Sequence, residues 1–128
     1  MSVENSLQRH SPGSRTILYD DGKIKISTEG IELSWYWFPI GPSKFIPFDS
    51  IRSHRLRRHM TIFEMKSWGM GADFQVWWHL DFRKFNGDRN AIIIDVGGWP
   101  KIGFYPGGGN LDEVEKAYAI ISARCHQD

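Results

Sequence analysis

An apolar stripe with the helical period lies near the end of this 128-residue sequence and limits the folds available to it. Its members recur every three or four residues, which is the spacing of one helix face. Asn110 precedes the stripe as a helix-capping residue, and Glu113 stands where a capping box has its acidic partner. The sequence therefore predicts one helix over Leu111–Cys125. The stripe consists of Leu111, Val114, Tyr118, Ile121 and Cys125.

Upstream of this helix, the sequence has the pattern of a β-rich domain. From Thr16 onward, short runs of apolar, β-branched and aromatic residues alternate with turn residues. Residues 23–27 alternate polar and apolar side chains after the turn Asp20-Asp21-Gly22, which indicates a hairpin. Residues 31–35 continue the alternation and place Trp35 on the apolar face. We expect about seven strands, a number and spacing typical of a sandwich or barrel.

The domain organisation follows from length and local composition. A chain of 128 residues has the size of a single domain with one hydrophobic core. Residues 1–15 are polar and include Ser11-Pro12-Gly13-Ser14, a composition that does not bury enough apolar surface to order itself. We predict a flexible tail over residues 1–15 and a single domain over residues 16–126.

Charge and cysteine content narrow the class of protein. The net charge of +1 argues against nucleic-acid or membrane binding by the whole surface, so no specific nucleic acid is expected. The single cysteine, Cys125, excludes a disulfide framework and indicates a reducing compartment. No run approaches the roughly 18 apolar residues of a transmembrane helix, and the first residues lack a signal peptide's apolar core. These features predict a cytoplasmic protein without a transmembrane segment.

Arginines are concentrated in residues 52–59, which contain four arginines and two histidines. Arginine forks bind phosphate and carboxylate oxygens, so this run is a candidate site for an acidic lipid headgroup, nucleic acid or an acidic protein. The other interpretation is a solvated edge strand whose charges prevent pairing between sheets. Strand alternation places Arg55 and Arg57 on the face opposite Leu56. The candidate anion-binding residues are Arg52, Arg55, Arg57 and Arg58.

The sequence is also rich in aromatic residues, with six Trp, eight Phe and four Tyr. Roughly half of the strand residues in a small barrel face inward, so most of these side chains are expected in the core. Neighbours such as Trp77 and Trp78 cannot point to the same side of a strand, so one of each pair is a candidate for an interface. The candidate interface aromatics are Trp37, Trp68 and Trp78.

Patterns of catalytic or metal-binding residues do not emerge from the sequence. The histidines lack HxxxH-type spacing with an acid. His79 and Asp81 lie two residues apart on a strand, where a cross-strand hydrogen bond or ion pair is more common than an acid–base pair. Cys125 belongs to the buried stripe, and buried cysteines are usually inert. We expect no enzyme activity, no cofactor and no metal.

Several segments resemble bacterial pleckstrin-homology-like (PH-like) domains, including uncharacterised members of that family. Residues 29–33, followed by residues 45–51, are similar to the opening strands of these domains, and the similarity extends over roughly residues 17–125. The resemblance implies a barrel of about seven antiparallel strands in two near-orthogonal sheets, capped by one C-terminal helix. It transfers no functional residue. The later matching pieces are Ser67–Gly71, Trp77-Trp78, Leu80-Asp81 and Ile93–Gly97.

Together, these observations predict a non-enzymatic binding or assembly module of the PH-like type. We expect it to act on a protein partner or to form a homo-oligomer. The alternative is an anion-binding module that uses the arginine-rich residues 52–59.

Overall fold

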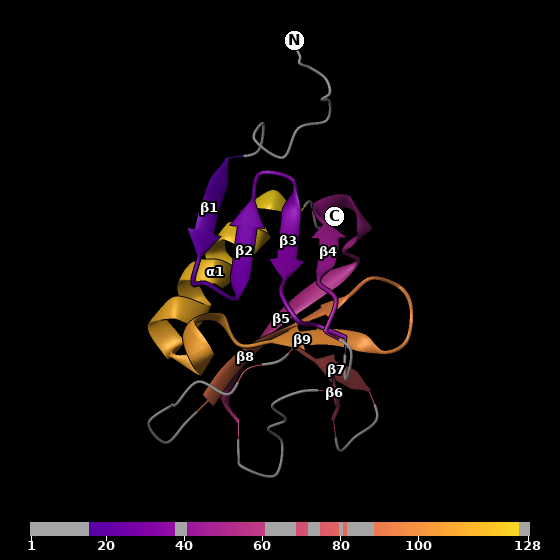
Figure 1. Cartoon of the computed structure of the whole chain (residues 1–128). Helices are drawn as coiled ribbons and strands as arrows, with labels where there is room; N and C mark the ends of the chain where they lie inside the picture. Colours follow the sequence, from indigo (N-terminus) through magenta and orange to yellow (C-terminus); the bar gives the residue numbers. More distant parts are fainter. Residues whose placement is uncertain are drawn as a thin grey trace.

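A computed structural model of the chain describes residues 16–37, 41–60, 69–71, 75–79, 81 and 89–125. These residues form nine strands in two sheets, followed by one α-helix (Figure 1). The prediction of a β-rich domain with one C-terminal helix is confirmed. The predicted tail over residues 1–15 lies outside the described residues.

The first sheet is an antiparallel meander, and the second sheet has the order β5-β8-β9-β7-β6. The strands of the first sheet are β1 (Ile17–Asp20), β2 (Ile24–Ser27), β3 (Gly30–Leu33) and β4 (Lys44–Pro47). Those of the second are β5 (Ser53–Met60), β6 (Gly69–Met70), β7 (Val76–Trp78), β8 (Arg89–Asp95) and β9 (Lys101–Phe104). The helices are the 3₁₀ helices η2 (Phe48–Ser50) and η3 (Pro106–Gly109) and the α-helix α1 (Leu111–Arg124).

The β1–β2 hairpin forms where the turn residues predict it. The Asp21 carboxylate accepts hydrogen bonds from the backbone N–H groups of Lys23 and Ile24 at 2.9 and 2.8 Å. Gly22 has a φ of 93°, a left-handed conformation that glycine adopts without strain. In the first sheet, Ile24 pairs with Leu33, and Ile26 with Ile31, and all four side chains are fully buried.

The second sheet is buried on both faces, which explains the uninterrupted apolar run of β8. Ile92 and Ile94 belong to the main core between the two sheets and α1, whereas Ala91 and Ile93 belong to a second cluster on the opposite face. Because neighbouring strand residues point to opposite faces, a strand buried on both sides needs no polar alternation. The second cluster contains Met60, Val76, Trp78, Ala91, Ile93 and Tyr105.

Strand number and direction differ from the predicted barrel of about seven antiparallel strands. The short strand β7 runs parallel to β9 and pairs with β6, so this hairpin extends the edge of the second sheet. β7 is three residues long and ends at Trp78. Within the described residues no ladder joins the two sheets, so the closed barrel remains a prediction.

The predicted strand over residues 31–35 is too long by two residues. β3 ends at Leu33, and Trp35 has a φ of 57° and an exposed fraction of 54%. A left-handed residue cannot continue a strand, because its backbone groups turn away from the ladder. The prediction that Trp35 shares the buried face of Ile31 and Leu33 is therefore wrong.

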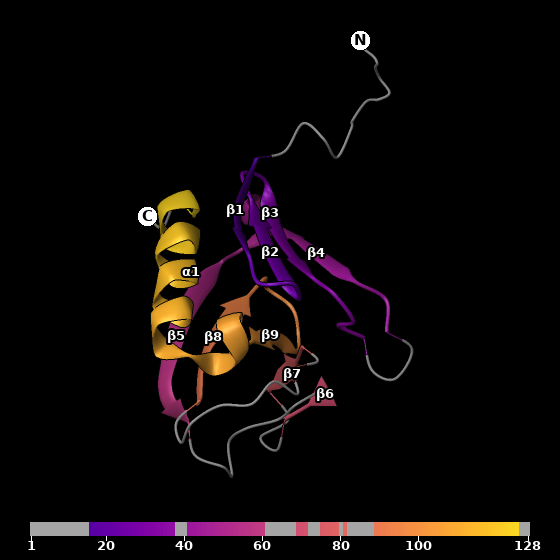
Figure 2. The ribbon, with the colours of Figure 1, turned by 60° about the vertical axis from the view of Figure 1, so that its left-hand side comes forward.

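Helix α1 stands along one side of the two sheets, with its apolar stripe toward the core (Figure 2). Val114, Ala117 and Ile121 are fully buried, and Cys125 is the C-cap. The side chain of Asn110 accepts a hydrogen bond from the Glu113 N–H at 3.3 Å, which confirms the predicted N-cap. The Glu113 carboxylate, which the sequence placed as the acidic partner of a capping box, accepts a hydrogen bond from the Tyr19 hydroxyl at 2.9 Å. This bond connects α1 to β1.

The burial of the α1 stripe predicts that Ile121→Asp unfolds the domain or lowers its free energy of unfolding by several kcal/mol. The reason is that the variant places a carboxylate in a site without exposure to water. Ala119→Asp, on the exposed side of the same helix, is the matched control and should cost about 1 kcal/mol or less. Chemical denaturation of both variants tests this, and near-native stability of Ile121→Asp would contradict the described core.

Candidate binding surface

Four aromatic side chains and a lysine gather where β3 leaves the first sheet, next to β7 of the second sheet. We call this set the aromatic corner. Its members lie at the end of β3, at the start of β4 and in β7, so it joins the two sheets at one end. The set consists of Trp35, Tyr36, Trp37, Lys44 and Trp77.

Reciprocal hydrogen bonds fix the base of the aromatic corner. The Tyr36 hydroxyl donates to the Trp77 carbonyl oxygen at 3.2 Å, and the Trp77 indole N–H donates to the Tyr36 carbonyl oxygen at 3.0 Å. Tyr36 is almost fully buried, and this burial raises the pKa of its hydroxyl above the usual range. Tyr36 and Trp77 therefore form a rigid support rather than an exposed contact.

Trp37 lies on this support and remains accessible, with an exposed fraction of 41%. Its ring meets the Tyr36 ring edge-on at a centroid distance of 5.0 Å and lies 6.1 Å from the Trp77 ring. The Lys44 ammonium group lies 5.1 Å from the centre of the Trp37 ring, within the range of a cation–π interaction. The prediction that Trp37 is exposed at a possible interface is consistent with this position.

Trp35, two residues before Trp37 in the chain, is also exposed and has an unusual backbone. Its left-handed φ is rarely adopted by a bulky residue, and such conformations are enriched at functional sites. The ring covers the Cα of Gly41 so closely that a side chain at position 41 would collide with it. From the sequence, residues 35–38 are a possible stacking platform or aromatic peptide groove, but core packing is the favoured interpretation, because strand alternation gives no signal for a left-handed turn.

Of the other predicted interface aromatics, Trp78 is a core residue and Trp68 lies outside the described residues. Trp78 is 3% exposed, and its ring stacks on Tyr105 at a centroid distance of 4.9 Å. The prediction of an exposed Trp78 is wrong, because the second face of the β5–β9 sheet is itself covered. Trp77, its neighbour, is the residue of the pair that supports the aromatic corner.

The structure divides the arginine-rich run between several environments. Strand β5 is at the edge of its sheet, as the edge-strand interpretation requires. Arg58 forms an exposed ion pair with Glu115 of α1 at 3.0 Å, and Arg52 covers the backbone of Gly97. Arg55 is exposed and Arg57 half-buried, and both lie on the face opposite Leu56, as the alternation predicted. The four candidate residues therefore do not form one continuous cationic site.

His54 lies on the α1 side of this strand, in contact with Tyr118. His54 Nδ1 lies 2.9 Å from the Tyr118 hydroxyl oxygen, and the hydroxyl also lies within 3.2 Å of the His54 carbonyl oxygen. His54 Nε2 is buried without a hydrogen-bond partner in the described part of the chain. Burial lowers the pKa of the imidazole, since the charged form loses hydration.

A buried polar cluster around Arg89 was not identified from the sequence. The Arg89 guanidinium pairs with Asp81 at 3.3 Å, donates to the Gly108 carbonyl oxygen and lies 3.9 Å from the centre of the Tyr105 ring. His79 contacts the Ser34 carbonyl oxygen. An arginine at the start of an apolar strand gives no sequence signal of burial, because arginine is usually exposed.

Metal ligands and the single cysteine are the remaining groups that could be chemically active in the described part of the chain. No group of three His, Cys, Asp or Glu side chains lies close enough together there to hold a metal ion. Cys125 is buried, and burial raises the pKa of its thiol, which disfavours the reactive thiolate. In the same part of the chain, no helix has the length and apolar content required to span a membrane.

Comparisons with known proteins do not assign this chain to a family. No protein-family model, curated protein or solved structure matches this chain. The PH-like resemblance therefore remains a prediction from the sequence segments alone.

The His54 environment predicts that acid destabilises the fold. The unfolded chain binds a proton at His54 near the usual pKa of 6.5, whereas the folded protein binds it only at lower pH. The free energy of unfolding therefore falls as the pH decreases below about 6.5, and this contribution is fully present above it. Denaturant titrations at about pH 7.5 and 5.5 should show a smaller decrease for His54→Gln than for the native chain.

His59→Asn is the control for this experiment, since His59 is an exposed histidine of the same strand and asparagine tolerates its left-handed backbone. It should retain the native pH dependence. Equal pH dependence in all three proteins would show that the His54 environment does not contribute.

The division of the arginine run predicts that replacing Arg55 and Arg57 together by Gln leaves binding to anionic vesicles and nucleic acid unchanged. Aggregation should increase instead, because the edge of β5 loses its protecting charges. Vesicle co-sedimentation, nucleic-acid titration and light scattering measure these outcomes. Lys23→Gln with Lys25→Gln is a control with the same loss of charge. Arginine-dependent binding whose log affinity falls with log salt at a slope of about two would contradict the edge-strand interpretation.

Proposed function

We propose that this chain is a non-enzymatic binding or assembly module with a PH-like fold, which associates with a protein partner or a second copy through the aromatic corner. The observation that carries this proposal is the exposure of Trp37 on a hydrogen-bonded support, with Trp35 also exposed two residues earlier in the chain. Trp and Tyr are enriched at binding interfaces, where a rigid aromatic surface loses little conformational entropy on association.

The PH-like part of the proposal is supported by the order of the strands. A four-stranded antiparallel meander, then the antiparallel strands β5, β8 and β9, and then one amphipathic helix follow the order that the sequence resemblance implies. In this interpretation the β6–β7 hairpin is an addition at the edge of the second sheet. Barrel closure, with α1 as its cap, belongs to the proposal.

The proposal of a non-enzymatic role is supported by the partners of the titratable groups. The Asp81 carboxylate is held by a buried arginine, and the Cys125 thiol is buried with a raised pKa. Neither arrangement provides an activated nucleophile or a general base beside an open cavity. A cytoplasmic location is part of the same proposal, on the basis of the single buried cysteine.

Anion binding remains a second candidate function, favoured by the exposed Arg55 and Arg52. Neither side chain has a hydrogen-bond or ion-pair partner within the described residues. Arg58 is already paired with Glu115, which leaves less charge for a polyanion than the sequence run indicates. An acidic protein surface suits this smaller charge better than a nucleic acid does.

The aromatic-corner proposal predicts that the chain self-associates or binds its partner less well when Trp35 is replaced by Asn. Asparagine tolerates the left-handed backbone, so the fold is retained while the exposed ring is lost. We expect the dissociation constant of self-association, from light scattering over a concentration series, to rise about tenfold or more. Ile17→Thr removes an exposed apolar side chain from β1 and should leave the constant unchanged. A native chain that stays monomeric up to about millimolar concentration would exclude the homo-oligomer.

A further inference from the structure

A groove opens between the first sheet and the last turn of α1. It is formed by the β2–β3 turn, by β4 with η2, and by the C-terminal turn of the helix, and its volume is about 660 Å³. This volume lies within the range of ligand-binding pockets. The lining residues are Thr28, Glu29, Phe45, Pro47, Phe48, Asp49, Ala123 and Arg124.

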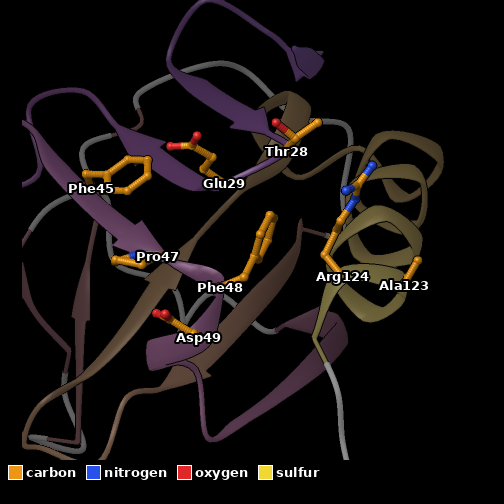
Figure 3. A pocket seen from close by; sticks show the side chains of 8 residues that line it. All are labelled: Thr28, Glu29, Phe45, Pro47, Phe48, Asp49, Ala123 and Arg124. Atoms are coloured by element: carbon orange, nitrogen blue, oxygen red, sulfur yellow. The ribbon is translucent and has the colours of Figure 1, made fainter. Parts of the chain in front are cut away.

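Apolar side chains form the floor and one wall of the groove. Figure 3 shows the Phe48 ring between the sheet and the helix, with Phe45 and Pro47 on the sheet side. Phe48 belongs to the main core and exposes only its outer edge, so it provides a fixed apolar contact. Phe45 is exposed and covers the backbone of Gly30.

The charges of the groove are separated across this apolar floor. The carboxylates of Glu29 and Asp49 lie on the sheet side, and the Arg124 guanidinium lies on the helix side (Figure 3). Within the described residues, the side chains of Asp49 and Arg124 have no hydrogen-bond or ion-pair partner. The groove therefore presents an unpaired anion and an unpaired cation on opposite rims.

This distribution selects the chemistry of an occupant. A purely anionic ligand meets two carboxylates, and a purely cationic one meets Arg124. A ligand that carries a cation, an apolar group and a carboxylate in succession complements both rims and the floor. An extended polypeptide with a basic, an apolar and an acidic side chain has this chemistry and suits an open groove.

We propose that this groove binds an extended segment of a partner protein in which an apolar side chain lies between a basic and an acidic one. The apolar side chain contacts Phe48, the basic side chain pairs with Asp49 and Glu29, and the acidic side chain pairs with Arg124. The inference rests on the proposed function, since it gives the partner chemistry of a binding module at a second surface.

The test uses the full chain and two acetylated, amidated peptides, Arg-Ser-Leu-Ser-Glu and its uncharged counterpart Gln-Ser-Leu-Ser-Gln. Amide chemical shifts of the ¹⁵N-labelled chain are followed by NMR during each titration. We expect the charged peptide to shift the amides of Thr28, Asp49 and Arg124 and to bind about fivefold more tightly than the uncharged one. Its advantage should decrease at high salt, because exposed ion pairs are screened.

Matched variants distinguish the effect of the groove charges on peptide affinity from the effect of the net charge of the chain. Asp49→Asn and Arg124→Gln should each reduce the advantage of the charged peptide, whereas Asp112→Asn and Lys116→Gln, on the exposed surface of α1, should not. Equal binding of the two peptides, shifts confined to residues outside the groove, or equal effects of the groove and control variants would each overturn the proposal.

The same spectra distinguish this proposal from the proposed function. If the chemical shifts of the groove amides change when the chain is diluted without peptide, the occupant is a second copy of the chain. This result would contradict binding of a partner segment. If neither peptide binds the groove while Trp35→Asn still weakens self-association, the groove inference is wrong and the aromatic-corner function stands. If the peptides bind and the chain stays monomeric, the groove is the binding surface and self-association is excluded.

Discussion

The buried contact between Arg89 and Asp81 is the interaction on which the rest of this structure depends. Both side chains are almost completely removed from water, so the pair is favourable only because further bonds satisfy the guanidinium. Arg89 donates to the carbonyl oxygens of Gly108 and Asp81, and Tyr105 covers its flat face. Since η3 leads directly into α1, these bonds also position the start of the helix. Asn90 adds a second anchor through its bond to the Gly109 carbonyl oxygen at 2.8 Å.

The β5–β9 sheet carries two apolar layers. One face packs against the first sheet and α1, and the other is covered by Trp78 and Tyr105, whose rings stack above β9. Gly103 lies directly under the Trp78 ring, which leaves no room for a larger side chain. Among the described aromatic residues, Trp35, Trp37 and Trp99 are exposed outside the strands, whereas Phe45 is exposed within β4.

A feature of the fold or of the candidate surfaces could be predicted from the sequence only where a local residue pattern determines it. The α1 stripe and the Asn110 cap follow from spacing alone, and the structure has both. Trp78 and Trp35 were misplaced because strand alternation specifies opposite faces but not which face is covered, nor where a strand ends in a left-handed residue. Arg89 was missed because its burial depends on a partner eight residues away and on a loop near the helix. Non-local contacts of this kind leave no periodic trace in a sequence.

The positions of the two candidate surfaces follow from the same architecture. The aromatic corner lies where β3 leaves the first sheet beside β7, and the groove lies where β4 and η2 approach the last turn of α1. Each surface combines turn residues with an element of another layer, so its geometry requires the two layers to be fixed relative to one another. The Tyr36–Trp77 hydrogen bonds provide this at the corner, and the burial of Ile121 and Cys125 provides it near the groove. Rigid placement of exposed side chains by buried ones limits the entropy lost on binding, which is the physical basis for the binding role proposed for both surfaces.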